Sequence, residues 1–140
     1  MHEPFFGGNE KEYVLDCINS TFVSSIGSYV SKFEEELANY CKCGEAIAVV
    51  NGTSALHAAL HVVGVKANDE VLTQAFTFVA TANAIKYCGA NPIFVDVDID
   101  TMGMSASSLK IFLEMNAEIR EGKCINKNTG NKIAACIPMH

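Results

Sequence analysis

The segment "EAIAVVNGTSALHAALHVVGVKANDEVLT", residues 45–73, decides the fold, because its hydrophobic pattern changes period twice. Residues 45–50 form a short apolar run, which is typical of a strand covered on both faces. A helix is predicted next, because one face of it would carry the apolar residues Leu56, Ala59, Leu60 and Val63. Gly64 is placed to end this helix. A second strand is predicted at residues 69–73. The segment therefore predicts a strand, a helix and another strand in immediate succession.

The same alternation continues to the end of the sequence. Further elements are predicted in the order helix, strand, helix, strand, at residues 76–89, 91–97, 105–115 and 131–139. Ser105 is placed to cap the second of these helices, and residues 120–131 form a polar, turn-rich link. Strands that alternate with helices need right-handed crossover connections. We therefore expect an α/β fold over residues 45–140, with a mostly parallel sheet as the middle of three layers.

Residues 1–44 have a different character and are expected to form an N-terminal helical segment. One helix is predicted within residues 9–20, where Val14, Cys17 and Ile18 make an apolar stripe. A second is predicted at residues 29–40, with the acidic run Glu34–Glu36 on its solvated face. A polar link that contains glycine joins the two helices.

The composition excludes several classes of function. The 140 residues carry a net charge of −6, and the ten lysine and arginine residues are scattered, so a nucleic-acid partner is not expected. No apolar run approaches the ~20 residues that a membrane-spanning helix needs, and the N-terminus lacks the order of a signal peptide. The expected location is therefore the cytoplasm. The six cysteines form no CxxC pair, so we expect reduced thiols and no structural metal site.

The "NGTS" sequence at residues 51–54 is the first candidate for chemistry, because it follows a predicted strand and opens a helix. Ligands of parallel sheets bind at this edge, where helix N-termini offer unpaired N–H groups to anions. Gly52 has no side chain, so an anion can approach the backbone closely. The N–H groups of Thr53, Ser54 and Ala55 are expected to be free, and the hydroxyl groups of Thr53 and Ser54 can add hydrogen bonds to the anion. The alternative is that Asn51, Thr53 or Ser54 only caps the helix. Both interpretations stay open on the motif alone.

Two further patterns carry weaker signals. His57 and His61 have the spacing of a metal pair, but no third ligand is evident, so two histidines on a helix surface are favoured. Phe76 and Phe78 lie where the chain leaves the strand at residues 69–73 for the next helix. One of these rings can stack on a planar ligand, although an aromatic residue at such a position also serves the core.

Taken together, the segments resemble the N-terminal part of the pyridoxal-phosphate-dependent sugar aminotransferases of the DegT/DnrJ/EryC1/StrS family. The matching stretches are "VSSIGSYVSKFEEELANY", "AVVNGTSALHAAL", "GVKANDEVLTQAFTFVATANAIKYCGANPIFVDVDIDT" and "IPMH". The opening "HEPFFGGNEKEYVLDCINSTFVSS" is similar to the branch that acts on nucleotide-linked 4-keto sugars in legionaminic-acid and related surface-glycan pathways. The resemblance implies that residues 45–140 are part of the large, pyridoxal-phosphate-binding domain of the fold-type I, aspartate-aminotransferase-like architecture.

The resemblance also implies roles for individual residues and for partners. The segment that matches Gly52, Thr53 and Ser54 holds the phosphate of pyridoxal 5′-phosphate in such enzymes. The aromatic residue of the matching "TFVAT" stacks on the pyridine ring, which selects Phe78 over Phe76. The loop with Ser24, Ser25 and Gly27 matches a loop near the substrate. The implied substrates are a nucleotide sugar and an amino donor, expected to be glutamate, and the implied assembly is a homodimer.

One departure from the family pattern bears on catalysis. The Schiff-base lysine of the family, its pyridine-facing aspartate and its small C-terminal domain all match positions beyond His140, and none of the nine lysines here has the family's lysine context. We therefore expect an N-terminal fragment without catalytic residues, inactive alone, and prone to self-association through an exposed sheet edge. Two alternatives stay open: a sugar dehydratase of the same family, and a non-catalytic, flavodoxin-like domain that binds a small ligand.

Overall fold

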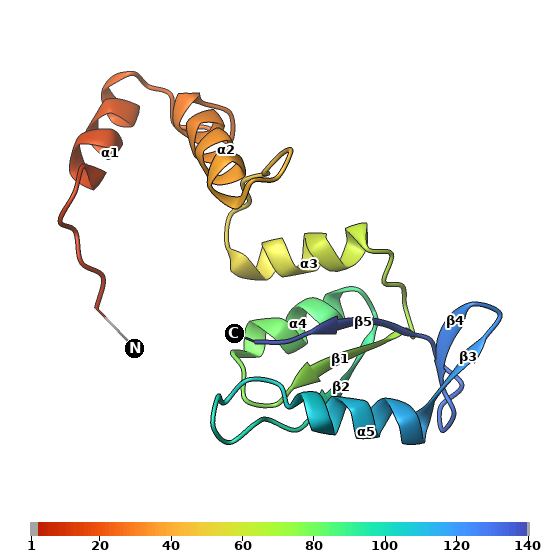
Figure 1. Ribbon diagram of the computed structural model, residues 1–140. Helices are drawn as coiled ribbons and strands as arrows, with labels where there is room; N and C mark the ends of the chain where they lie inside the picture. The colour runs from red at the N-terminus through yellow and green to blue at the C-terminus, as the bar shows by residue number, and fades with distance from the viewer. Residues whose placement is uncertain (1–2, 140) are drawn as a thin grey trace. The chain divides into compact units, whose positions relative to one another are not determined.

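The computed structural model describes residues 3–139 (Figure 1). Contacts between residues divide the chain into two compact units, Met1–Ala48 and Val49–His140, which are called the first and the second unit below. Each unit has its own architecture and is described by itself. The second unit contains the sheet.

The first unit contains the two helices predicted from the sequence, α1 (Glu10–Asn19) and α2 (Ser28–Cys41). The rings of Tyr13 and Tyr29 lie 5.1 Å apart and join the two helices. Ala38 is the one buried hydrophobic residue in the described part of this unit, so its core is small. Within residues 3–139, no helix is both long enough and apolar enough to cross a membrane.

The second unit is built around a parallel sheet, which confirms the predicted α/β class. Its elements follow one another as α3 (Gly52–Val62), β1 (Glu70–Gln74), α4 (Val79–Tyr87), β2 (Asn91–Val95), α5 (Ala106–Asn116) and β5 (Ile133–Ile137). The strand order is β2-β1-β5, and β1 pairs in parallel with both neighbours. The predicted cap of α5 is confirmed, because Ser105 Oγ accepts a hydrogen bond of 3.2 Å from the N–H of Ser108.

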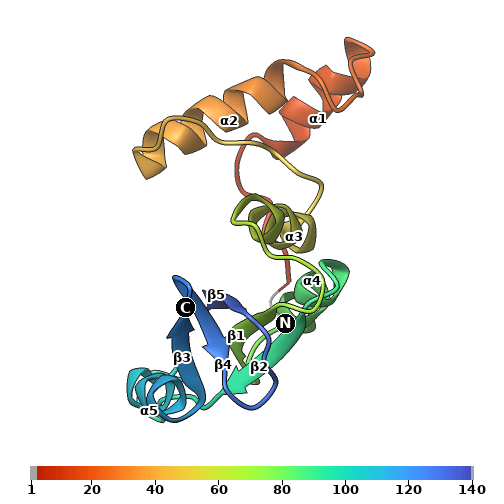
Figure 2. The ribbon, with the colours of Figure 1, turned by 90° about the vertical axis from the view of Figure 1, so that its right-hand side faces the viewer.

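Helices cover both faces of this sheet, so the unit has the three predicted layers (Figures 1 and 2). Successive residues of a strand point to opposite faces. Val71 of β1 therefore packs with Leu60 of α3 and Ile85 of α4. Leu72 packs on the other face, in a cluster that includes Phe112 of α5. The central strand β1 is buried along its whole length and connects the two cores.

The strand predicted at residues 45–50 is not formed, and this expectation was wrong. Residues 45–49 have no regular secondary structure, and the side chains of Ile47 and Val50 are 80% and 87% exposed. A strand is stable only when its backbone groups pair with a neighbouring strand. Among the described residues no strand pairs with this segment, so its apolar side chains lie outside both cores. The N–H of Ala48 instead donates to Glu34 Oε1 of α2, at 2.7 Å.

A β-hairpin lies between the predicted helix at residues 105–115 and the strand β5, and it overlaps the predicted polar link at residues 120–131. Strands β3 (Ala117–Arg120) and β4 (Lys123–Asn126) pair antiparallel, and Glu121 and Gly122 form their turn with positive φ values of 52° and 73°. Two successive positive φ values are typical of the tight turns that match the twist of a hairpin. The polar composition of this segment therefore concealed a short two-stranded element.

Candidate functional site

The second unit has a cavity of about 740 Å³ at the N-terminal ends of α3 and α4. The residues that line it come from the first two turns of α3 and the start of α4: Asn51, Gly52, Thr53, Ala55, Leu56, Ala59, Phe78, Ala80 and Thr81. None of these lining side chains is charged. The two helices lie side by side on the same face of the sheet (Figure 2), so both helix N-termini point their partial positive charge toward this region.

Asn51, the first residue of the "NGTS" sequence, is the N-cap of α3. Its Oδ1 accepts a hydrogen bond of 2.9 Å from the N–H of Ser54, and its carbonyl accepts one of 3.0 Å from Ala55. The expectation that the N–H groups of Ser54 and Ala55 are free was therefore wrong. Within the described residues, the N–H groups of Gly52 and Thr53 have no acceptor and stay available to a ligand. Capping and anion binding are therefore compatible here.

Gly52 is not required by the folded chain itself. A Cβ atom built at this position would meet no other atom within 4 Å, and the residue does not have a positive φ. Neither packing nor backbone geometry thus explains the absence of a side chain. Open space in front of the free N–H groups is the arrangement that a bound phosphate oxygen needs.

Phe78 lines the cavity from the start of α4, whereas Phe76 is not one of the lining residues. Phe78 is the N-cap residue of α4, and its ring is 76% exposed although it is one of the largest apolar side chains of the unit. An exposed aromatic face beside an uncharged cavity can stack on a planar ring. Gly52, Thr53 and Phe78, which were predicted separately, therefore lie around the same cavity.

The remaining predicted residues lie elsewhere. Ser54 adjoins the cavity in sequence but is not among its lining residues. Ser24 and Gly27 line a small pocket of about 70 Å³ between α1 and α2 in the first unit, and Ser25 does not line it. The structure does not test the substrate role of these three residues.

The histidine pair of α3 shows no metal site. The ring of His57 packs edge-on against Tyr87, with ring centroids 5.7 Å apart. Within residues 3–139 no group of three histidine, cysteine or acidic side chains could hold a metal ion.

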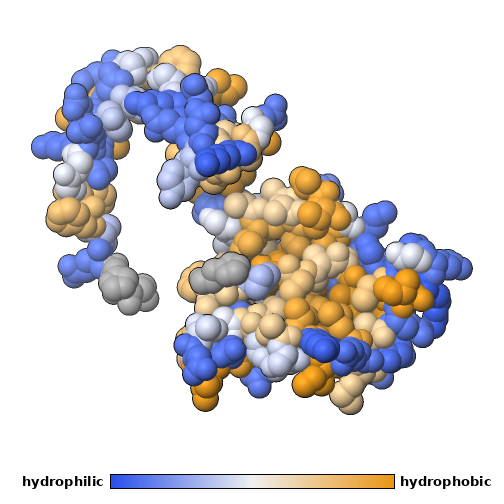
Figure 3. Space-filling model, in the orientation of Figure 1, coloured by the Kyte–Doolittle hydropathy of each residue, from blue (hydrophilic) through white to orange (hydrophobic). Residues whose placement is uncertain are grey.

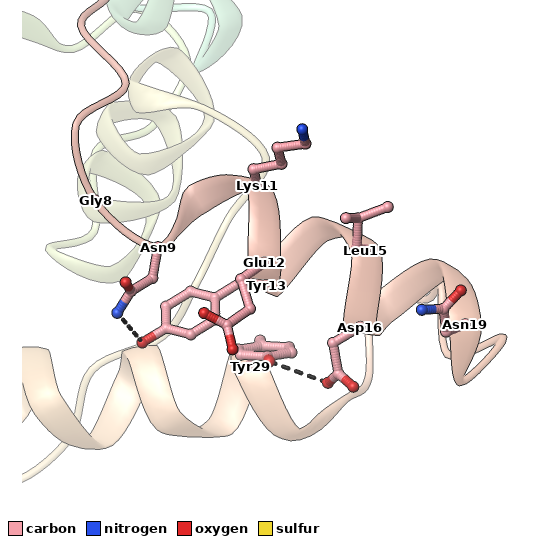
Figure 4. A pocket seen from close by; sticks show the side chains of 9 residues that line it. All are labelled: Gly8, Asn9, Lys11, Glu12, Tyr13, Leu15, Asp16, Asn19 and Tyr29. Carbon is pink, nitrogen blue, oxygen red and sulfur yellow. Dashed lines mark hydrogen bonds between the residues drawn. The ribbon is translucent and has the colours of Figure 1, made fainter.

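A groove in the first unit, shown from close by in Figure 4, was not predicted from the sequence. In this groove the Tyr29 hydroxyl donates to Asp16 Oδ2 at 3.0 Å, and Asn9 Nδ2 donates to the Tyr13 hydroxyl at 3.4 Å. Desolvation and the hydrogen bond to the Asp16 carboxylate raise the pKa of Tyr29 above its usual value. The hydroxyl of Tyr29 therefore acts as a neutral hydrogen-bond donor that ties α2 to α1.

Comparison with known proteins assigns the chain to a family. The model of the DegT/DnrJ/EryC1/StrS aminotransferase family matches residues 5–118. The chain belongs to this family. The family predicted from the sequence is therefore confirmed, and the match covers both the helices of the first unit and the cavity of the second.

Individual relatives agree with this DegT/DnrJ/EryC1/StrS assignment. GDP-perosamine synthase of Caulobacter vibrioides is 43% identical over 110 residues, which are 79% of this chain and 30% of that protein. The putative pyridoxal phosphate-dependent aminotransferase EpsN of Bacillus subtilis is 42% identical over 81% of this chain and 29% of its own length. The crystal structure of a DegT DnrJ EryC1 StrS aminotransferase from Brucella abortus matches 93% of this chain and 32% of its own, with 29% identity and a TM-score of 0.77. The chain thus spans less than a third of the length of these relatives.

Proposed function

We propose that the second unit binds the phosphate and the pyridine ring of pyridoxal 5′-phosphate as part of a sugar aminotransferase. The observation that carries this proposal is that Gly52, Thr53 and Phe78 line one uncharged cavity. The free N–H groups of Gly52 and Thr53, with the Thr53 hydroxyl, suit a phosphate group, and the Phe78 ring suits a planar heterocycle. The hydroxyl of Ser54 completes the proposed phosphate site. The family and the name of EpsN support the identity of the ligand.

The chain's own residues bind and orient the cofactor in this proposal. When bound, the cofactor supplies the electron sink that amino-group transfer needs. The N-terminus of α3 holds the phosphate and so fixes one end of the molecule. Stacking on Phe78 fixes the plane of the ring, with a contribution of about 0.5–1.5 kcal/mol beyond burial. The proposal assigns to these lining residues only the binding and orientation of the cofactor.

We further propose that the whole enzyme transfers an amino group from glutamate to a nucleotide-linked 4-keto sugar for surface-glycan synthesis. The relative named GDP-perosamine synthase supports a nucleotide-linked sugar. In this proposal Ser24, Ser25 and Gly27 contact the substrate and the enzyme is a homodimer. The location is the cytoplasm, where the six cysteines stay as thiols. The 140-residue chain alone does not catalyse the transfer, and appearance of an amino sugar with the purified chain would contradict this.

The binding step can be tested with pyridoxamine 5′-phosphate rather than with the aldehyde form, because an aldehyde reacts with any of the nine lysines. Titration followed by ligand fluorescence is expected to show saturable binding to the purified chain. Thr53→Ala should weaken this binding by about tenfold or more, because it removes a hydrogen bond to a charged group worth ~1.5–3 kcal/mol.

Ser107→Ala is the matched control, because it removes a hydroxyl from the first turn of α5, a different helix of the same unit. Its affinity should equal that of the wild type. Equal affinities of Thr53→Ala and the wild type would instead leave the "NGTS" sequence as a helix cap only.

A further inference from the structure

Gln74 ends the central strand β1 and is fully buried, with 0% of its surface exposed. Its side-chain amide is hydrogen-bonded to three different loops. Nε2 donates to the carbonyl oxygens of Phe76, at 2.9 Å, and Met102, at 3.1 Å. Oε1 accepts a hydrogen bond of 3.2 Å from the N–H of Met139. The partners follow β1, β2 and β5, so one side chain ties together the loops at the carboxyl ends of all three parallel strands.

The partners fix the orientation of this amide. Two carbonyl oxygens need donors and one N–H needs an acceptor, so the nitrogen and oxygen of Gln74 cannot exchange places. A buried amide with both N–H groups bonded holds its partners firmly, because breaking either bond leaves a polar group without water. The carbonyl of Phe76 is therefore held in one position.

This carbonyl lies two residues before Phe78. The intervening residue, Thr77, is also fixed, because its N–H donates to the carbonyl of Ala75 at 3.0 Å and its hydroxyl lies 3.0 Å from that of Thr81. The Phe78 ring itself is 76% exposed, so packing of the ring contributes little to its position. The position of the ring thus depends on the backbone of residues 75–78, and this backbone depends on Gln74.

We infer that Gln74 is a positioning residue, which sets the place of the Phe78 ring through the backbone of residues 75–78. The inference rests on the proposed function, since it deepens the role of Phe78 as the residue that stacks on the cofactor ring. Gln74 itself is not one of the residues that line the cavity. Its effect should therefore appear in the ring contact and not in the phosphate contact.

The first test needs no ligand. The chain has no tryptophan, so Phe78→Trp introduces a single fluorescent reporter at the ring position. In this background Gln74→Leu should lower the fluorescence anisotropy and increase quenching by iodide. Thr73→Val is the matched control, because it removes the buried 3.0 Å hydrogen bond from Thr73 Oγ1 to the Ile137 carbonyl and leaves the three loops tied. The control should not move the reporter, and an unmoved reporter in Gln74→Leu would overturn the inference.

The second test uses two ligands with Phe78 restored. Gln74→Leu should weaken binding of pyridoxamine 5′-phosphate by about two- to tenfold, which is the range of one stacking contact, and leave binding of inorganic phosphate unchanged. In a Phe78→Ala background Gln74→Leu should have no further effect, because the ring through which it acts is gone. An equal loss in both backgrounds, or an equal loss for both ligands, would show a merely structural role and overturn the inference.

Gln74→Glu keeps the side-chain volume and provides the test if Gln74→Leu does not fold. A carboxylate cannot donate to the two carbonyl oxygens, whereas the protonated acid has one O–H donor. The affinity of Gln74→Glu for pyridoxamine 5′-phosphate, divided by that of the wild type at the same pH, should therefore rise toward one as the pH is lowered from 8 to 5. A ratio that does not change with pH would count against positioning by hydrogen bonds.

The outcomes separate this inference from the proposed function. If the wild type binds no pyridoxamine 5′-phosphate, the proposed function fails and the tryptophan reporter alone decides the role of Gln74. If the wild type binds the ligand and Gln74→Leu changes neither the reporter nor the affinity, the inference fails and the proposed function stands.

Discussion

Gly52 and Gly64 lie at the two ends of α3, and different physical requirements explain the glycine at each position. Gly52 has ordinary helical geometry and open space around it, whereas Gly64 follows α3 with a φ of +85°, which a side chain disfavours. Only the second glycine is explained by the backbone of the chain. The first is explained by the ligand that we propose.

Paired substitutions at these positions can test this difference. Gly52→Ala should leave the melting temperature unchanged or slightly higher, because alanine is favoured in a helix, and should weaken binding of pyridoxamine 5′-phosphate. Gly64→Ala should lower the free energy of unfolding by about 1 kcal/mol and leave the affinity unchanged. Thermal unfolding and the same ligand titration measure both effects. Unchanged affinity in Gly52→Ala would mean that no ligand approaches this residue.

The sequence predicts part of the candidate site at this scale. Gly52, Thr53 and Phe78 line one cavity, although the strand expected before α3 is not formed. They come together because α3 packs beside α4, and their roles toward a ligand stay a prediction. The free N–H groups are predicted one to two residues too late, because the motif does not show that Asn51 is the cap. Gln74 is not predicted at all, because its partners lie up to 65 residues away and only the fold brings them together.

At the scale of elements, one buried carboxylate contributes hydrogen bonds that link the hairpin β3–β4 to the sheet. Glu70, at the start of β1, is 1% exposed. Its Oε2 accepts a 2.8 Å hydrogen bond from Asn126 Nδ2 of β4, and its Oε1 accepts one of 2.7 Å from Thr129 Oγ1. The carboxylate thus joins the start of β1 to two residues that follow Glu70 by 56 and 59 positions in the chain.

Glu70→Leu should lower the free energy of unfolding by about 1–3 kcal/mol, because it leaves the buried amide of Asn126 without its acceptor. Hydrogen exchange should become faster in the amides of β3 and β4. Glu118→Leu is the control on the same hairpin: its exposed ion pair with Arg120 should contribute at most about 1 kcal/mol. Urea unfolding and hydrogen-exchange mass spectrometry measure these effects, and equal unfolding free energies of the two variants would contradict the anchor.

Hydrophobic periodicity in the sequence predicts some strands correctly and others not. The strands predicted at residues 69–73, 91–97 and 131–139 form as β1, β2 and β5, with ends that differ by up to two residues, because they pair with one another. The apolar run at residues 45–50 has the same local pattern but no partner strand in the described chain. Local sequence therefore reports the tendency to form a strand, while pairing decides whether it forms. The hairpin shows the reverse case, since its two strands supply each other's partner despite a polar sequence.

At the scale of the whole chain, β5 is an edge strand with one open side in the described structure. A broad apolar area covers the face of the second unit that Figure 3 shows, where Figure 1 draws β5 and the neighbouring helices. An open edge beside apolar surface favours pairing with another chain.

We therefore expect the purified chain to self-associate, with a mean mass above that of a monomer in light scattering that rises with concentration. Cys136→Lys places a charge on an exposed position of β5 and should reduce the association, because charged side chains protect sheet edges. Cys41→Lys adds the same charge at an exposed position of α2 and is the control for net charge. A monodisperse monomer of the wild type over the whole concentration range would contradict this expectation.

The strand order β2-β1-β5 also has a consequence for synthesis on the ribosome. β1 can pair with β2 as soon as both have left the exit tunnel, but its second neighbour, β5, begins 38 residues after the end of β2. At about 5–20 residues per second, this interval lasts roughly 2–8 s. During that time one side of the central strand is open in the nascent chain. The order of the strands therefore sets a period in which a chaperone has access to an edge that the folded protein later closes.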